Sequence, residues 1–426
     1  MKKRILSIMI VAALALSMTA CGAASDETAA EVDVITTVST ALKADEEKEE
    51  SKAEETEKEA EETTVEETEA ETTTAAPLEI YEATAKDFEY QYDAVLNGMK
   101  ITQYIGNNEI EAIKIPDILD NEIVVAIGRN GLNNDDIKKI ILPDSITAID
   151  EFAFSYCSSL EEINIPDGVT YIGDSAFSQC KNLREITIPD NVTYIGNSAF
   201  SETGIEKIII PNGITQICDN TFFRCVNLTE ITIPDSVTYI GSSAFEETSI
   251  KEINIPNGVT TIGSHTFFSC ANFKKIAIPN SVTNIGEYAF AYSGITEITI
   301  PENVTEIRER AFSSCENLKK ANVLCREVVL YFGVFEECKN LEEVTFNIEC
   351  FTRMESLFRN CTKLRNITFP NNMLDTFSSN FFDGCEGLTV IYRDNEYNYS
   401  TSAELYKDIM YNFQNEVVYF VDQLTI

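Results

Sequence analysis

Residues 162–183 read EINIPDGVTYIGDSAFSQCKNL, and residues 230–250 read EITIPDSVTYIGSSAFEETSI. The two stretches are a long and a short form of one repeated unit. Its prolines recur every 22 or 23 residues, at Pro143, Pro166, Pro189, Pro211, Pro234, Pro256, Pro279 and Pro301. A period of this length predicts a solenoid, in which each unit is one turn and neighbouring turns share a continuous core.

The alternation of side chains within a unit predicts a short strand. In LREITIP, residues 183–189, we expect Leu183, Ile186 and Ile188 to face the core and Glu185 and Thr187 to face solvent. The VTYIG and AF segments that follow supply further apolar side chains, the latter from the opposite wall. Parallel stacking of such strands, at about 4.8 Å per turn, predicts a mainly β body roughly 50 Å long.

A cysteine position recurs in the same repeat. The Phe-x-x-Cys position marks eleven units, at Cys157, Cys180, Thr203, Cys225, Thr248, Cys270, Ser293, Cys315, Cys338, Cys361 and Cys385. Equivalent Cα atoms of adjacent turns would lie about 5 Å apart, within disulfide range. However, Thr or Ser replaces Cys in three units, and stacked side chains point in parallel, so we predict buried free thiols. The units with Thr or Ser are also those with the shorter turn.

The pattern L-x-x-I-x-I-P-x-x-V-T-x-I-G-x-x-A-F-x-x-C resembles the BspA-like class of leucine-rich repeats, also described from treponemal surface proteins. It covers residues 137–391 and is strongest from Leu160 to Leu318. The resemblance implies a curved solenoid displayed outside the cell, with family members acting as adhesins for host matrix proteins or other bacteria. NVLCREVVLYFGVF and TFNIECFTRMESLF depart from the pattern, because they lack the Pro, Val-Thr and Ile-Gly positions.

The N-terminus carries an export signal. Residues 1–21 read MKKRILSIMIVAALALSMTAC, a basic start followed by an apolar run too short for an ordinary membrane span. The stretch resembles the lipobox of bacterial lipoproteins, although Met18 stands where Leu is usual. The resemblance implies cleavage after residue 20 and lipidation of Cys21, which is the only membrane attachment expected. An ordinary secretory peptide with a free Cys21 is the alternative.

The segment 21–84 is predicted to be a disordered tether that follows the lipidated cysteine. Residues 25–84 contain 21 acidic and 4 basic side chains and are otherwise mostly Ala and Thr. Like charge opposes compaction, and little apolar surface is available for a core. An acidic tail that binds cations or basic proteins is the alternative function of this segment.

The flanks of the repeats are predicted to be caps. Residues 85–136 contain a hairpin around Asn97-Gly98 and a degenerate first unit ending at Ile127-Gly128. Residues 392–426 are predicted to be the C-terminal cap, with Leu405, Ile409 and Phe413 on one face of a helix and VVYFV as a closing strand.

The first candidate binding surface is the outer face of the strand sheet. Its positions carry small polar side chains beside a row of mixed charge, which could bind an extended polymer or protein, or could simply be solvated. We name as candidates Glu162, Asn164, Glu185, Thr187, Lys207, Glu230, Thr232, Glu252, Asn254, Lys275, Glu297 and Thr299. This stripe has few of the Trp, Tyr and Arg side chains that dominate binding energy at interfaces.

The second candidate is the irregular stretch VVLYFGVF. Val329, Tyr331 and Phe332 fall at positions that are polar or Gly elsewhere, so they form either an apolar partner site or a repacked core. Catalysis has little support, because His265 is the only histidine and is predicted to face solvent; no nucleophile motif, phosphate loop or zinc-ligand spacing is present.

These features together predict a surface lipoprotein that is no enzyme and needs no cofactor. The net charge of −38 excludes nucleic acid as a default partner, since phosphate binding needs a basic face. An extracellular protein or glycan is the expected ligand, with adhesion to a host or to neighbouring bacteria as the role. The alternative is a structural or scaffold component of the bacterial envelope that docks another surface protein. The oligomeric state is left open.

Overall fold

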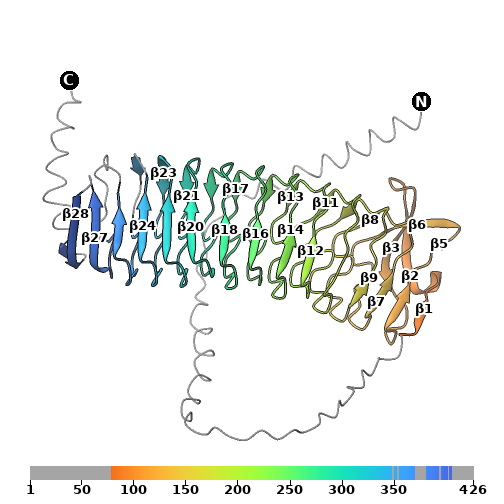
Figure 1. The fold of residues 1–426 in the computed structure, drawn as a ribbon. Helices are drawn as coiled ribbons and strands as arrows, with labels where there is room; N and C mark the ends of the chain where they lie inside the picture. Colours follow the sequence, from red (N-terminus) through yellow and green to blue (C-terminus); the bar gives the residue numbers. More distant parts are fainter. Residues whose placement is uncertain are drawn as a thin grey trace, which may run out of the picture. The chain divides into compact units, whose positions relative to one another are not determined.

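The computed structural model describes residues 78–347, 350–352, 355–369, 380–392, 395–401 and 403–404. All of them belong to one compact unit, Leu78–Ile426. In this unit the repeats form a parallel β-solenoid, in which each repeat makes one turn (Figure 1). The predicted signal peptide, the predicted lipidation site Cys21, and the predicted C-terminal helix and closing strand lie outside the described residues, and so does most of the predicted tether.

The first wall of the solenoid consists of the E-I-x-I strands that the repeat predicts. These strands are parallel except for the last pair. Its strands are β1 (Ile80–Glu82), β4 (Ala112–Lys114), β7 (Lys139–Ile141), β9 (Glu162–Ile163), β12 (Lys207–Ile209), β14 (Glu230–Thr232), β16 (Glu252–Asn254), β18 (Lys275–Ala277), β20 (Glu297–Ile300), β22 (Lys320–Val323), β24 (Glu343–Phe346), β26 (Asn366–Thr368), β27 (Glu386–Tyr392) and β28 (Asn395–Thr401).

The second wall was not predicted as a sheet. The VTYIG segment contributes a strand of only two residues in most turns, and these strands pair in register from turn to turn. Its strands are β2 (Phe88–Asp93), β3 (Gly98–Tyr104), β5 (Ile118–Leu119), β6 (Glu122–Ile127), β8 (Ala148–Ile149), β10 (Tyr171–Ile172), β11 (Tyr194–Ile195), β13 (Gln216–Ile217), β15 (Tyr239–Ile240), β17 (Thr261–Ile262), β19 (Asn284–Ile285), β21 (Glu306–Ile307), β23 (Glu327–Leu330) and β25 (Cys350–Thr352).

The third wall consists of the G-x-x-A-F-x-x-C segments, which form turns. Alternate N–H groups donate to carbonyls of the following turn, as from Phe154 to Ala176 at 2.8 Å, so the wall is hydrogen-bonded along the solenoid axis. Two non-glycine residues per turn adopt the left-handed backbone conformation, for example Ser243 at φ 52° and Glu247 at φ 55°. This conformation is uncommon for residues with a Cβ, so the hydrogen bonds between turns must offset its cost.

The core is a continuous column of apolar side chains between the three walls. The phenylalanine of each A-F segment stacks on its equivalent in the next turn, with centroids 5.0–5.7 Å apart from Phe154 to Phe358. Leu183, Ile186 and Ile188 are buried and Glu185 and Thr187 are exposed, as predicted.

One strand prediction was wrong. The segment 184–189 forms no strand, although its side chains alternate as expected. The first-wall ladder is therefore interrupted between β9 and β12, and again between β14 and β16 and between β18 and β20. Because these strands are only two to four residues long, the loss of one or two ladder hydrogen bonds is enough to end the pairing.

The ends of the solenoid carry antiparallel pairs. At the N-terminal end, β2 and β3 form the hairpin predicted around Asn97-Gly98, with Asn97 in the left-handed conformation at φ 57°. The 3-10 turn η2 (Ala85–Asp87) precedes β2. At the other end, β28 pairs antiparallel with β27 (Figure 1). The described residues contain no helix that has the length and apolar character needed to cross a bilayer.

Candidate functional site

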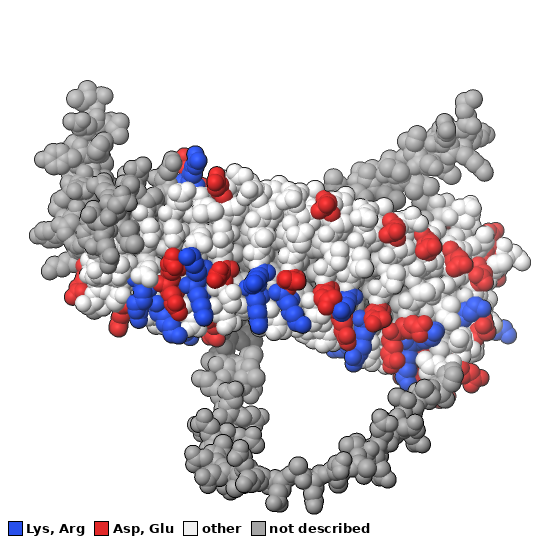
Figure 2. Space-filling view, viewed as in Figure 1, with Lys and Arg blue, Asp and Glu red and all other residues white. Residues whose placement is uncertain are grey.

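The first wall exposes every predicted sheet-face residue. Figure 2 shows a row of charged side chains along one edge of the solenoid body. All twelve candidates of the stripe, from Glu162 to Thr299, are solvent-exposed. Several of them are already engaged within the fold. The amide of Asn164 donates to the carbonyl of Leu142 at 3.0 Å and accepts its N–H at 2.8 Å, and Lys207 pairs with Glu230 at 2.8 Å. Much of this row is therefore a ladder of side chains that bind one another.

The third wall carries a cluster that combines aromatic and arginine side chains. We name it the aromatic–arginine patch and define it as His265, Phe268, Tyr288, Tyr292, Arg310 and Phe332. These residues come from four successive turns. Three of them, His265, Tyr288 and Arg310, share one position of the repeat, which is Ser or Asn in the four turns before them. Of the six, Tyr292 is the most open, with 53% of its surface exposed, and the others are half-buried.

Contacts between turns hold the patch together. The His265 ring stacks on Tyr288 at 5.1 Å, and Phe268 packs edge-on against Tyr292 at 5.4 Å. The Arg310 guanidinium lies 5.8 Å from the centroid of Tyr288 and 4.9 Å from that of Phe332. Since each contact joins side chains of neighbouring turns, the patch is pre-organised along the solenoid axis.

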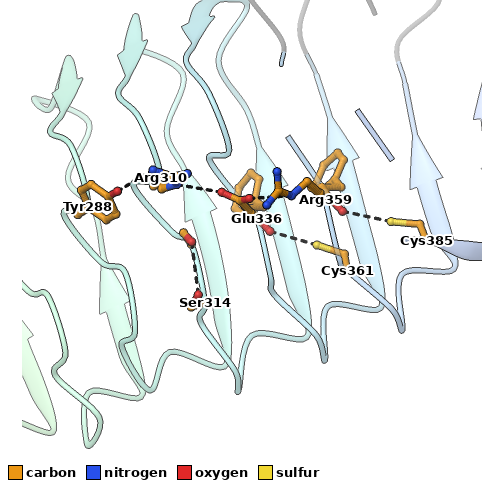
Figure 3. Close-up of polar contacts among 10 residues, drawn as sticks. Tyr288, Arg310, Ser314, Glu336, Arg359, Cys361 and Cys385 are labelled. Carbon is orange, nitrogen blue, oxygen red and sulfur yellow. Dashed lines mark hydrogen bonds and ion pairs between the residues drawn. The ribbon is translucent and has the colours of Figure 1, made fainter. Parts of the chain in front are cut away.

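A buried carboxylate anchors the arginine of the patch. Glu336 is only 5% exposed and accepts from Arg310 Nε at 2.9 Å and from Arg359 Nε at 2.9 Å (Figure 3). Arg310 also donates from Nη1 to the hydroxyl of Tyr288 at 2.8 Å. These bonds fix the guanidinium plane, which reduces the entropy that Arg310 would lose on binding a partner.

The irregular stretch overlaps this patch at Phe332. Val328 belongs to the core, whereas Val329, Tyr331 and Phe332 are half-buried on β23 and directly after it. Arg308 lies 5.5 Å from the Tyr331 centroid. The stretch therefore continues the solenoid and also adds aromatic surface next to Arg308 and Arg310.

The cysteines form an internal spine. Ten cysteines of the repeat body, from Cys157 to Cys385, are free and buried, as predicted. At the Phe-x-x-Cys position, Sγ donates to a main-chain carbonyl of the preceding turn, at 2.9–3.2 Å. Burial raises the pKa of Cys225 and Cys270 to about 11 and that of Cys157 to about 12, which disfavours the reactive thiolate.

In the short units that carry Thr, a hydroxyl stands in place of the thiol and donates its hydrogen bond within its own turn. Thr203 Oγ1 donates to the carbonyl of Phe200 at 2.8 Å and contacts Cys225 Sγ of the next turn at 3.2 Å. Thr248 repeats this arrangement with Phe245 and Cys270. The exchange of Cys for Thr keeps the position filled and hydrogen-bonded where the turn is one residue shorter.

His265 was expected to face solvent. It lies on the outside of the third wall, where contacts with Phe268 and Tyr288 leave its ring half-buried. Alignment of the repeats would have indicated this, since His265, Tyr288 and Arg310 occupy the same position in three successive turns. Across the described ranges, no three His, Cys, Asp or Glu side chains gather closely enough to hold a metal ion.

Comparison with known proteins agrees with this architecture. The model of the BspA type leucine rich repeat region matches residues 100–206, 193–319 and 329–403, in six copies. A leucine-rich repeat protein from Bacteroides ovatus is 27% identical, with a TM-score of 0.54 over 67% of this chain and 87% of its own. A leucine rich cell surface protein from Faecalibacterium prausnitzii is 28% identical, with a TM-score of 0.50 over 72% and 87%. No curated protein matches.

Proposed function

Because the chain belongs to the BspA-type leucine-rich repeat family, we propose that it is a non-catalytic adhesin, displayed on the bacterial surface, that binds an extracellular protein. The observation that carries the proposal is the aromatic–arginine patch. Tyr and Arg dominate the binding energy of protein interfaces, and the patch places Tyr288, Tyr292 and Arg310 together on one exposed wall.

Pre-organisation supports binding at this patch rather than a purely structural role. The half-buried rings and the guanidinium fixed by Glu336 lose little side-chain freedom when a partner covers them. Tyr292 has Ser269 and Ser314 as its equivalents in the two adjacent turns, so its neighbours along this column are small. A ring that protrudes between small neighbours is the shape of an interface anchor.

Surface display is the second part of the proposal. It rests on the predicted lipidation of Cys21 and on the acidic segment that follows it, together with the similarity to a cell surface protein. Lipidation would attach the chain to the membrane, and self-repulsion in the tether would hold the repeat body away from it. The Cys21→Ser variant should no longer associate with the membrane, and protease added to intact cells should no longer cleave it from their surface. Retention of both would contradict lipid anchoring.

The binding test uses the full mature chain, immobilised and offered a panel of extracellular-matrix proteins and an envelope extract of the bacterium. Tyr292→Ser and the double variant Tyr331→Ser, Phe332→Ser should each weaken capture of a matrix protein by about tenfold or more. Tyr156→Ser is the matched control, because Tyr156 is 58% exposed and lies at the position of Tyr292 in an earlier turn.

Three outcomes separate the alternatives. Capture that falls in the patch variants and not in Tyr156→Ser supports the proposed site. Equal capture by all variants would remove the patch from the binding surface. Capture of envelope proteins alone would favour the scaffold role over adhesion.

A further inference from the structure

A groove of about 880 Å³ crosses the first wall between β18 and β20, on a different wall from the aromatic–arginine patch. Ala277 and Thr299, which occupy equivalent exposed positions of the two strands, line this groove. Lys275 and Glu297 lie at the start of the two strands, and Asn280 lies beyond the end of β18. In Figure 2 the middle of this wall is uncharged, and the charged row runs along one edge.

One feature of the main chain and two of the sequence accompany the groove at this place. The strand ladder is interrupted between β18 and β20, whereas β16 pairs with β18 and β20 pairs with β22. The central outward position is Ala277, where other turns have the larger Ile209, Thr232 or Asn254. Leu324 lines the groove as well and stands where the regular units have proline.

The charged side chains of this wall are paired differently at the groove than elsewhere. Elsewhere on this wall neighbouring turns pair their charges, as Lys139 with Glu162 at 2.7 Å and Lys320 with Glu343 at 2.9 Å. Within the described structure, Glu252, Lys275 and Glu297 alternate in sign over three successive turns but make no ion pair with one another. Their donors and acceptors therefore point to solvent around the groove.

From this juxtaposition we propose that the groove binds a neutral glycan chain. A sugar hydroxyl both donates and accepts, so it is matched by adjacent groups of the two kinds, here the ammonium of Lys275, the carboxylate of Glu297 and the hydroxyl of Thr299. Asn303 donates to the carbonyl of Asn280 at 2.7 Å, which leaves its own carbonyl oxygen as a fixed acceptor at the rim. Ala277 and Leu324 provide the apolar surface that the C–H groups of a sugar ring contact.

The same features disfavour an anionic polymer or a protein as the ligand of this groove. An anionic polymer would meet Glu297 and Glu302 in the groove, which cancel much of the attraction of Lys275. A protein partner would need a desolvated aromatic or arginine anchor, and no lining residue is of that kind. The inference goes beyond the proposed adhesion to protein and holds whether or not that partner is found.

The test measures binding of the full chain to soluble neutral polysaccharides, with dextran, xylan, mannan and laminarin as probes, by affinity electrophoresis and calorimetry. Ala277→Phe adds a ring to the lining of the groove without changing its charge. The double variant Lys275→Ala, Glu297→Ala removes the donor and acceptor and also keeps the net charge. All three positions are exposed, and an unchanged unfolding temperature will establish that the variants fold. The matched control is Lys207→Ala, Glu230→Ala, which removes an ion-paired rung outside the groove.

We expect at least one neutral glycan to bind, with a loss of about tenfold or more in both groove variants. In the double variant Lys275→Ala, Glu297→Ala, each lost hydrogen bond to a charged group weakens binding by about that factor, and in Ala277→Phe the added ring occupies space that the glycan would fill. The control should bind within about twofold of the original chain, and added salt should change the affinity little. The proposal is overturned by equal loss in the control, by no binding of the four glycans, or by steeply salt-dependent binding of polygalacturonate or heparin alone.

Discussion

Phe245→Ala should lower the free energy of unfolding by about 4 kcal/mol, and should do so locally. The Phe245 side chain is fully buried, and its ring is nearly parallel to Phe222 at 5.7 Å and to Phe267 at 5.6 Å. Removal of a buried phenylalanine costs about 3–5 kcal/mol, including the cavity that is left. The loss of two stacked pairs, each contributing about 0.5–1.5 kcal/mol, places the expected value in the upper half of that range.

The locality follows from the one-dimensional architecture. Each turn contacts only its two neighbours, so the substitution weakens the two interfaces on either side of residue 245 and leaves distant interfaces intact. Urea unfolding will give the total change, and hydrogen exchange measured by mass spectrometry will place it. Protection should fall for the peptides that cover residues 222–267 and stay unchanged near Phe312.

Val226→Ala is the control, because Val226 lies in the same stretch of turns and is 57% exposed. It should leave both readouts unchanged. A loss below about 1 kcal/mol for Phe245→Ala would show that the phenylalanine column does not hold the turns together as the stacking geometry requires. A uniform loss of protection along the whole body would refute the nearest-neighbour argument even if the magnitude were right.

Three further predictions concern the charges and thiols of the fold. Glu336→Ala should lower the free energy of unfolding by about 1–3 kcal/mol, since two guanidinium groups lose a buried acceptor. Glu230→Ala at the exposed pair should give no measurable change, and equal effects of the two substitutions in urea unfolding would contradict this. The native chain should resist iodoacetamide at pH 8 and be alkylated fully in urea, because burial raises the pKa of Cys325 and Cys385 to about 12; rapid native labelling would count against the buried spine. The hydrogen bond from Lys100 lowers the pKa of Asp93. The stability that this bond adds to the fold is therefore present above the ordinary carboxyl pKa and is lost as the pH falls through the lowered value. Asp93→Asn should therefore lose less stability than the original chain between about pH 5 and pH 2, and superimposable acid-unfolding curves would refute the assignment.

The sequence predicts the core of this protein almost completely, because the repeat shows the same apolar positions many times. Leu183, Ile186 and Ile188 could be assigned from one unit, and the buried thiols from the replacement of Cys by Thr in the shorter turns. The second wall could not be predicted in the same way. Tyr194–Ile195 is a strand of two residues, too short to show an alternation, and only its pairing with the adjacent turns identifies it as a strand.

The candidate sites were harder to predict than the core, because they depend on contacts between turns. The sequence singled out Tyr331 and Phe332 from their departure from the repeat. It missed Tyr288, Tyr292 and Arg310, which stand at variable positions of the repeat and become a patch only when residues 22 or 23 positions apart are placed side by side. The groove at Ala277 depends on an interrupted strand ladder, a feature of main-chain geometry that no residue type encodes.

The two proposed sites lie at outward positions, which the solenoid constrains less than its inward positions. A substitution at Phe245 or Cys225 changes contacts with the neighbouring turns, so the inward positions are nearly constant along the chain. An outward position such as 277 or 292 touches few neighbours and can change alone. A ligand, however, spans several turns at about 4.8 Å each, so a site needs coordinated departures at equivalent positions of successive turns. His265, Tyr288 and Arg310 are such departures on the third wall, at one position of three successive turns. The proposed protein-binding site rests on this coordination, whereas the proposed glycan groove rests on single departures at Ala277 and Leu324.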